Sequence, residues 1–359
     1  MLPFKKYSSI ENTFDKDFVE KIKEQIPANQ AFVVQEKVHG SNVSFITDGA
    51  EIEFAKRTGV VEDGEKFYDY EELFERYRAK ILNLYKSVKA KYADLQTLIV
   101  FGEMFGGNYP HKDVKNNHKI SIIQKGVAYC PTHEFYGFDL YCHCGVYPAL
   151  AGQAPQSPEQ KHYFLPVEET NLFFANENFI YAKTLFSGAL EECLNYPNAF
   201  PSIIYKEFDL PEIADNICEG IVIRPAAPLY LRNGSRVLLK SKNARFAEKK
   251  SIKKRAPKVF VEPTYSENLK QLLSETELYV TENRLNNVVS KIGEIRVPRD
   301  TGKLIGLTAK DVLDDFLKEH SGEYAALEKS EQKIINTHIN KSVTVLIKKV
   351  YFFAKNLPL

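Results

Sequence analysis

The spacing of hydrophobic residues changes once along this chain, and that change limits the fold more than any other feature. Before about residue 248, short apolar runs and alternating apolar and polar residues predict strands with a few helices between them. From about Ser266 onward the spacing is helical almost throughout. We therefore expect an α+β domain at residues 1–248, a linker at 249–262 and a small all-α domain at 263–359.

Local patterns in the first domain support this division. Asp15 is expected to cap a short helix, and apolar alternation around Asp48-Gly49 predicts a β-hairpin with a tight turn. Residues 70–86 have helical spacing, and residues 135–142 alternate as a strand does. The alternation predicts one shared face for Tyr136, Phe138, Leu140 and Cys142.

The final part of the chain carries the signals of packed helices. Thr308 with Asp311 resembles a capping box, although the usual partner is Glu or Gln. The last helix is expected to bury a stripe made of Ile335, Ile339, Val343, Leu346, Ile347 and Val350. A stripe of this kind needs other helices to cover it.

Composition excludes several classes of protein. Apolar residues make up 44% and charged residues 26% of the chain, which argues against intrinsic disorder and low complexity. No stretch approaches the roughly 20 uninterrupted apolar residues of a membrane span, and the first residues show no secretory signal. Five Cys, an odd number, suit a reducing compartment. We expect a cytoplasmic protein, in an ordinary or a virus-infected cell.

The near-neutral total charge of +1 hides one basic segment. Between Val237 and Lys258, nine basic residues and one acidic residue give a charge of +8, which leaves −7 for the rest of the chain. The basic residues are Lys240, Lys242, Arg245, Lys249, Lys250, Lys253, Lys254, Arg255 and Lys258. Such a basic strip can attract a polyanion such as RNA, and the alternative is a solvated linker.

Lys37 lies at the end of an apolar strand, within the sequence Glu36-Lys-Val-His-Gly-Ser-Asn42. A lysine placed there could be an exposed residue before a turn. Alternatively, Gly40 lets the backbone turn sharply while the amine of Lys37 faces a pocket. A neutral amine is a nucleophile, and burial together with neighbouring cations favours the neutral form.

Other charged residues are expected at strand ends. Lys240 and Lys242 share one face of a strand, about 7 Å apart, which suits a polyphosphate better than a core. Glu219 stands at the mouth of a buried strand and could hold Mg²⁺, a cation that prefers hard oxygen ligands. Glu103 and Phe138 occupy similar positions, and the aromatic ring could stack on a nucleobase. Each signal alone is better explained by an ordinary strand end or a core residue.

The order of these residues is more specific than any one of them. The succession of Lys37-x-His39-Gly40, Arg57, Glu103, Phe138-Asp139, Glu219-Gly220 and Lys240-x-Lys242 resembles the covalent nucleotidyltransferase superfamily of polynucleotide ligases and mRNA capping enzymes. His39 is informative because DNA ligases and capping enzymes usually carry Asp at this position. The sequence around it is similar to the RNA ligase 2 family, which includes a phage double-strand RNA ligase and the kinetoplastid RNA-editing ligases.

The resemblance extends over most of the chain. Residues 4–12, 231–249 and 283–295 are similar to the phage enzyme, whereas residues 105–111 and 123–127 are similar to the editing ligases. Residues 143–210 match poorly, which leaves their contribution open.

The resemblance implies an ATP-dependent RNA ligase that joins 3′-hydroxyl and 5′-phosphate ends, preferably at nicks in duplex RNA. The first domain would be an adenylyltransferase with an ATP-grasp-like fold, in which antiparallel sheets surround a nucleotide cleft. The second would be a helical RNA-binding domain. ATP as substrate, Mg²⁺ or Mn²⁺ as cofactor, an RNA partner and a monomeric state follow as expectations.

The resemblance also assigns roles to residues. Lys37 would be the nucleophile that forms a Lys–AMP intermediate, and Glu219 would hold the metal ion. Nucleotide contacts are expected from Tyr7, Glu36, Val38, His39, Asn42, Arg57, Glu103, Phe138, Lys240 and Lys242. RNA contacts are expected from Arg245, Lys249, Lys250, Lys253, Lys254 and Arg255.

Two other functions remain open from the sequence. One is a GTP-dependent nucleotidyltransferase of the capping type, and the other is a catalytically silent protein that binds RNA through the basic strip. A zinc site at Cys142-His-Cys144 with His133 lacks the usual second pair of ligands. Residues 102–107 are rich in glycine but lack the Lys-Ser/Thr ending of a P-loop.

Overall fold

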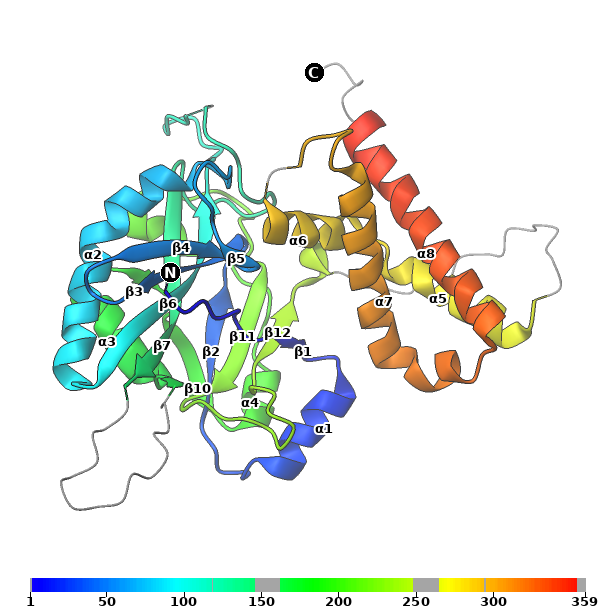
Figure 1. Ribbon diagram of the computed structural model, residues 1–359, viewed down its shortest axis with the longest axis horizontal. Helices are drawn as coiled ribbons and strands as arrows, with labels where there is room; N and C mark the ends of the chain where they lie inside the picture. The colour runs from blue at the N-terminus through cyan, green and yellow to red at the C-terminus, as the bar shows by residue number, and fades with distance from the viewer. Residues whose placement is uncertain (1, 118, 146–161, 248–264, 294, 354–359) are drawn as a thin grey trace. The chain divides into compact units, whose positions relative to one another are not determined.

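The computed structural model describes residues 2–117, 119–145, 162–247, 265–293 and 295–353. The chain forms two compact units, Met1–Asn243 and Ala244–Leu359 (Figure 1). The predicted linker at residues 249–262 lies outside the described residues. Among the helices that the structure describes, none combines the length and the apolar character needed to cross a membrane.

The first unit contains a five-stranded sheet, which we call sheet A. Its strands are, in spatial order, β1 (Glu11–Asn12), β12 (Leu239–Lys242), β11 (Gly220–Pro225), β2 (Phe32–Lys37) and β10 (Thr184–Gly188). All neighbours are antiparallel except β1 and β12. Helices α1 (Lys16–Gln25) and α4 (Leu190–Leu194) pack their apolar side chains on one face of this sheet. As predicted, the side chain of Asp15 caps α1 by accepting a hydrogen bond from the Phe18 amide.

A second sheet, sheet B, follows a simple antiparallel order. Its strands are β5 (Gly59–Val60), β4 (Ile52–Lys56), β3 (Ser41–Thr47), β6 (Leu95–Gly106), β7 (His133–Cys144) and β8 (His162–Phe164), and β9 (Ile180–Tyr181) pairs with β7 in parallel. Strands β3 and β4 form the hairpin predicted around Asp48-Gly49. The expected α+β class with antiparallel sheets is confirmed.

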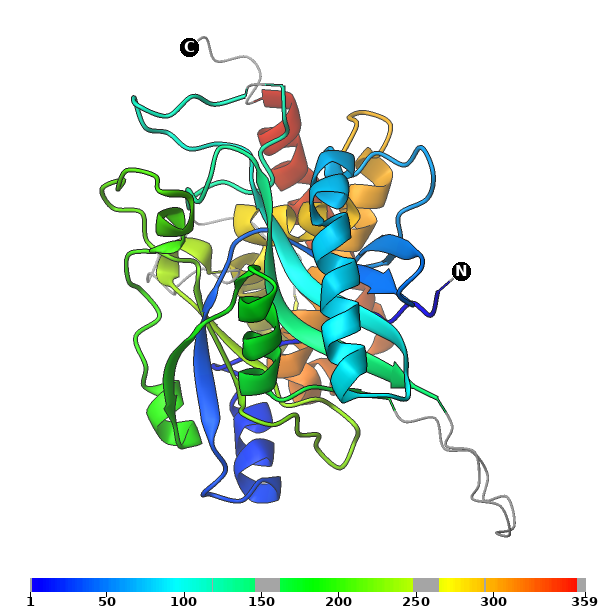
Figure 2. The same ribbon diagram turned by 90° about the vertical axis from the view of Figure 1, so that its left-hand side faces the viewer.

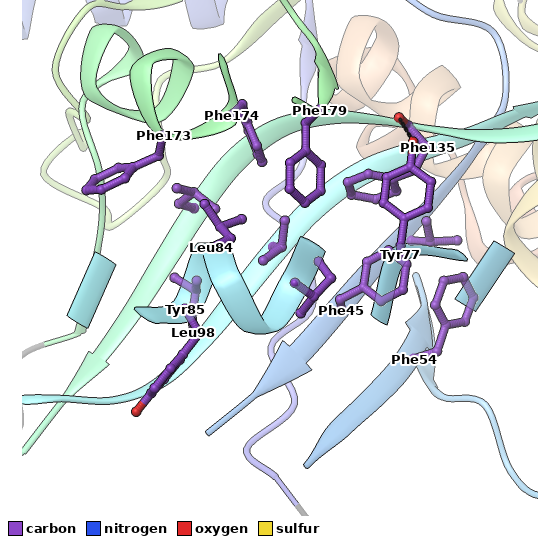
Figure 3. Close-up of a cluster of buried hydrophobic side chains, with 14 of the residues drawn as sticks. Phe45, Phe54, Tyr77, Leu84, Tyr85, Leu98, Phe135, Phe173, Phe174 and Phe179 are labelled. Carbon is purple, nitrogen blue, oxygen red and sulfur yellow. Dashed lines mark hydrogen bonds between the residues drawn. The ribbon is translucent and has the colours of Figure 1, made fainter. Parts of the chain in front are cut away.

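Two helices cover the outer face of sheet B. Figure 2 shows α2 (Tyr70–Lys91) and α3 (Val167–Asn176) running beside each other along its long strands. The aromatic cluster beneath them centres on Phe45, whose ring lies 5.2 Å from Phe54 and 5.1 Å from Phe135 (Figure 3). This cluster packs one face of sheet B against its helices. The opposite face of sheet B is directed toward sheet A.

Strand β7 departs from regular alternation at Phe138. The register with β6 shifts there, because Phe101 is opposite Asp139 while Gly102 is opposite Gly137. The extra residue is a β-bulge, and the alternation of side chains after it is out of phase with the alternation before it. Leu140 and Cys142 lie in the cluster under α2 and α3, whereas Phe138 packs against Tyr7. Tyr136 also lies away from that cluster, near Phe105, whereas its neighbour Phe135 lies in it. The prediction of one shared face was therefore wrong: Tyr136 and Phe138 lie on one face, and Leu140 and Cys142 lie on the other.

The second unit is helical. It contains α5 (Glu267–Tyr279), α6 (Glu282–Ile292), α7 (Thr301–Ala325), α8 (Lys329–Lys348), a short 3-10 helix (Ala244–Phe246) and a π-helical end (Lys349–Phe353). Ile335, Ile339, Val343 and Ile347 are buried along α8, which confirms the predicted stripe. The shared core of the four α-helices comes from this and similar stripes.

The predicted capping box at Thr308 is wrong. Helix α7 begins seven residues earlier, at Thr301, and Thr308 is buried inside it. Asp311 instead forms an ion pair with Arg284 of α6, with 2.7 Å between the guanidinium and the carboxylate. Arg284 is only 2% exposed, so this pair ties α6 to α7 from within. Asp311, which resembled part of a helix cap, instead pairs with a residue on another helix, and local spacing does not encode such a pair.

Replacement of Phe45 by Ala should destabilise the first unit by about 3–5 kcal/mol, because the cavity would lie at the centre of the aromatic cluster. Chemical denaturation followed by near-ultraviolet circular dichroism measures this change. Leu172→Ala on α3 is the control, since its side chain is 60% exposed and its loss should change the free energy of unfolding little. Equal effects of the two substitutions would contradict the assigned core.

Candidate active site

Three strand ends meet at one edge of sheet A. Gly220 is opposite Lys37 on one side and opposite Lys242 on the other. Lys37 is the last residue of β2, Lys242 is the last of β12, and Glu219 directly precedes β11 between them. The register of the sheet therefore places a carboxylate between two ammonium groups.

Glu219 is the centre of this arrangement. One oxygen, Oε2, lies 2.7 Å from the Lys37 Nζ and 3.3 Å from the His39 Nδ1, and the other, Oε1, lies 2.8 Å from the Lys242 Nζ. The carboxylate is 1% exposed. Burial acts to raise its pKa, but Lys242, Lys37 and His39 outweigh burial and hold the pKa of Glu219 well below its usual range. Glu219 is therefore a permanent anion at neutral pH.

The chain crosses from sheet A to sheet B directly after Lys37. Gly40 lies in this crossing, and a Cβ there would come within 2.3 Å of the Met104 carbonyl oxygen and 2.8 Å of the Glu103 Cγ. Glycine is required by this close approach of β6 rather than by a left-handed backbone conformation, since Gly40 is not among the residues with positive φ. The crossing brings Asn42 opposite Glu103 in sheet B.

Glu103 faces the same group of charges from sheet B. Burial raises its pKa to about 7, while the attraction of Lys37 opposes the rise and the Glu219 carboxylate adds to it. Arg57 follows β4 and interacts with Glu103, and burial lowers the pKa of Arg57. These interactions join Lys37, Glu103, Arg57 and Lys242 into one charged cluster.

A second group surrounds the bulge in β7. The Tyr7 ring lies 5.0 Å from the Phe138 ring in an edge-on arrangement, and its hydroxyl donates to Asp139 over 2.8 Å. Asp139 is fully buried and forms ion pairs with Arg224 at 2.8 Å and Arg236 at 2.7 Å. Burial acts to raise the pKa of Asp139, but the two arginines outweigh burial and hold this pKa below its usual range.

Arg224 and Arg236 were not predicted as site residues. Arg224 also donates to the Phe138 carbonyl over 3.0 Å, and the Arg236 guanidinium lies 3.5 Å from the centre of the Phe164 ring. Together the two arginines hold the Phe138 carbonyl and the Asp139 carboxylate, which in turn accepts from Tyr7. For Arg224 the signal in the sequence was a charge directly after the apolar run Ile221-Val-Ile223, because a charged residue in a buried strand needs a buried partner.

The remaining predicted residues are spread more widely. Lys240 lies on β12 opposite Val222, on the same face as Lys242, and the Asn42 side chain lies 3.5 Å from the Gly102 carbonyl. Glu36 points to the other face of β2, where burial raises its pKa to about 7, and Val38 is buried. Arg245 is exposed in the helical unit. The other predicted RNA contacts lie outside the described residues: Lys249, Lys250, Lys253, Lys254 and Arg255.

The charged cluster fits a magnesium ion only in part. Glu219 is an anionic oxygen donor, and Glu103 is a second carboxylate nearby. Across the residues that the structure describes, no group of three or more His, Cys, Asp or Glu could hold a metal ion. Mg²⁺ commonly binds one or two carboxylates and takes its other ligands from water and substrate phosphates. The residues present are consistent with that mode.

Comparison with known proteins identifies the family. Residues 30–242, more than half of the chain, match the model of the RNA ligase family. The chain belongs to the RNA ligase family. Residues 263–345 also match the C-terminal region of T4 RNA ligase 2. The sequence-based recognition of an RNA ligase is thus confirmed.

Two curated relatives are RNA ligases of Trypanosoma brucei brucei. Mitochondrial RNA-editing ligase 1 is 27% identical over 387 residues, which cover 92% of this chain and 77% of the relative. Mitochondrial RNA-editing ligase 2 is 24% identical over 366 residues, which cover 88% and 83%.

Solved structures of RNA ligases are more distant. An RNA ligase of Naegleria gruberi with ATP and manganese has 15% identity and a TM-score of 0.38, over 68% of this chain and 59% of that one. An archaeal ATP-dependent RNA ligase has 12% identity and a TM-score of 0.39, over 99% and 67%. Similarities this weak support no functional conclusion.

Glu103→Gln should raise the thermal midpoint of this RNA ligase at pH 8 and raise it less at pH 5. The folded carboxyl binds its proton up to about pH 7, whereas the unfolded one releases it near 4.5, so folding stability falls as the pH rises between these values. Glutamine carries no charge, so it removes the free-energy cost of keeping an ionised carboxylate buried at high pH. Differential scanning fluorimetry at the two pH values tests it, with exposed Glu72→Gln as control. A midpoint gain that is equal at both pH values would contradict the burial of Glu103.

Proposed function

We propose that the protein joins RNA 3′-hydroxyl and 5′-phosphate ends with ATP, preferably at nicks in duplex RNA, through a Lys37–AMP intermediate. The observation that carries this proposal is the Lys37 amine, 2.7 Å from a buried carboxylate that also binds Lys242. A nucleophile, an anion and a second cation at one strand edge suit transfer of a nucleotidyl group.

In the first step, Lys37 Nζ attacks the α-phosphorus of ATP. An N–P bond forms, the bond to the β-phosphate oxygen breaks, and pyrophosphate leaves. The ammonium form of Lys37 has no free electron pair, so it must release a proton and its hydrogen bond to Glu219 before it attacks. The AMP then passes to the RNA 5′-phosphate, and the 3′-hydroxyl displaces it as the RNA strands are joined.

Cations at the strand edge neutralise the phosphates. Lys242, and Lys240 on the same face of β12, stabilise the charge that develops on the α-phosphate. Arg57, which stays protonated at any physiological pH, contacts the nucleotide or the RNA ends. Phosphoryl-type transfer depends mainly on alignment and charge stabilisation, so these positions matter more than proton transfer.

A divalent cation would be held by Glu219, with Glu103 as a second carboxylate nearby. When bound, Mg²⁺ or Mn²⁺ would supply positive charge that lowers the repulsion between phosphates. Glu219 suits this role because its low pKa keeps it anionic.

The nucleoside part of ATP is expected beside the bulge in β7. Phe138 would stack on the adenine, with Tyr7 and the buried Asp139 supporting its ring. Glu103 would accept a hydrogen bond from the ribose. Backbone groups at Glu36 and Val38 would read the adenine edge, and His39 and Asn42 would take part in end transfer.

RNA is the second substrate. The basic strip, Lys240 to Lys258, would follow the phosphates and make binding dependent on salt. The helical unit would grip the duplex during end transfer. Recognition of A-form shape and 2′-hydroxyls, rather than of sequence, agrees with a preference for nicks.

The proposal extends to the state of the protein in the cell. We propose that it acts as a monomer in a reducing compartment such as the cytoplasm. All five cysteines are buried and free, which supports the choice of compartment.

Lys37→Ala should abolish the covalent attachment of AMP and leave RNA affinity close to that of the parent protein. The substitution removes the nucleophile without touching the basic strip. Incubation with α-labelled ATP, denaturing electrophoresis and RNA filter binding measure the two properties. Equal labelling of the variant would end this mechanism.

The same assay separates the other functions. Label taken up only from GTP would indicate a capping-type enzyme, and RNA binding without any label would indicate a catalytically silent protein.

Nicked duplex RNA should be sealed faster than the same nick in DNA and faster than unpaired RNA strands. The expected cause is recognition of the A-form helix and its 2′-hydroxyls on either side of the nick. Time courses with the three labelled substrates at equal concentration test this. Unpaired RNA joined as fast as nicked RNA would remove the preference for nicks from the proposal.

A further inference from the structure

The active-site residues of sheet A lie where the sheet stops. Lys37 and Lys242 each end a strand and Glu219 precedes one, so the regular strand pairing stops at these residues. The ion pairs to Glu219 hold the side chains of these two lysines, and the Lys242 pair remains when Lys37 is neutral, but neither pair holds the backbone. The alignment of the Lys242 ammonium in nucleotidyl transfer therefore also depends on what holds the end of β12.

The segment from Asn195 to Cys218 meets this strand edge from outside the sheet. The Asn198 side-chain amide donates to the Lys242 carbonyl over 3.1 Å and to the Ser241 hydroxyl over 2.9 Å. The Asn198 carbonyl accepts from the Cys218 thiol over 3.7 Å, and Cys218 directly precedes Glu219. One asparagine thus links the backbone of Lys242 to the backbone that carries its counterion.

The same segment reaches the turn after Lys37. Asn216 is 7% exposed, and its side chain both donates to Ala128 over 2.7 Å and accepts from it over 2.8 Å. The next residue, Tyr129, accepts a hydrogen bond from the His39 amide over 2.9 Å. Asn243 completes the frame, because its backbone amide donates to the Glu219 carbonyl over 2.9 Å.

These bonds form a frame around the charged cluster that is independent of the charges themselves. Side-chain amides suit this purpose, since they keep their hydrogen bonds whatever the protonation state of Lys37. The segment belongs mostly to residues 143–210, where the sequence resembles the known ligases least.

We propose that Asn198 is a positioning residue for the first chemical step, acting through the Lys242 backbone to hold that ammonium at the α-phosphate. The inference rests on the proposed function. It assigns to the 195–218 segment the task of fixing catalytic geometry, where a merely structural loop would only contribute to stability.

A double-mutant cycle tests the inference in the full-length protein. Asn198→Ala should slow the labelling of Lys37 by α-labelled ATP under single-turnover conditions about tenfold or more at saturating ATP, because displacements near 1 Å cost up to about 100-fold. In a Lys242→Ala background, the same substitution should change the rate less than twofold, since residues that act through one group are not additive.

Two controls complete the design. Asn195→Ala removes a side-chain hydrogen bond to Glu191 in the same segment and should leave the rate within twofold of the parent. Asn198→Gln retains the amide donors and should recover part of the loss. Amide hydrogen exchange at Ser241–Asn243, which needs no activity, should be faster in Asn198→Ala than in the parent.

The outcomes separate the two proposals. A parent protein that takes up no label contradicts the proposed function, and the exchange measurement then still decides whether Asn198 holds the strand end. A full rate in Asn198→Ala, or an equal loss in the parent and Lys242→Ala backgrounds, overturns the positioning role. A lower thermal midpoint with an unchanged rate would show that Asn198 is structural only.

Discussion

The buried carboxylate of Glu219 is the interaction on which the site depends. It lies between two lysine ammonium groups that would repel each other in its absence, and it is almost completely removed from water. Loss of one partner from a buried ion pair typically costs about 3–5 kcal/mol. Loss of Glu219 would also leave two like charges at the ends of the strands that flank β11. The register of β2, β11 and β12 determines the geometry of the site because it places the Glu219 carboxylate between Lys37 and Lys242.

The rest of the first unit serves to bring two sheets to this point. Helices α1 and α4 cover the outer face of sheet A, and α2 and α3 cover that of sheet B, so the inner faces are left for a further apolar cluster around Phe101 and for the charged groups of the site. Gly40 allows the crossing between the sheets at close range. Asp139, Arg224 and Arg236 then join the inner faces through buried ion pairs, and their low exposure makes this join rigid.

Local features of the fold could be predicted from the sequence, and features set by distant partners could not. The helix from Tyr70, the hairpin at Asp48-Gly49 and the stripe of α8 follow from spacing and turn chemistry alone. Asp311 has a local pattern typical of a cap, yet its partner is an arginine on another helix. The contact between Asp139 and Arg236 joins residues 97 positions apart, which no local pattern encodes. The order of the motif residues predicted the charged cluster because the family resemblance contains such long-range information.

The β-bulge at Phe138 separates pairing with the neighbouring strand from the placement of a side chain on one face of the sheet. In a regular ladder, every residue contributes both to pairing and to one face of the sheet. A bulged residue has no partner across the ladder, so β6 and β7 would pair continuously without it. Its ring packs against Tyr7 on the inner face and takes no part in the ladder. A substitution at this single position therefore changes the inner face without altering the register of the sheet.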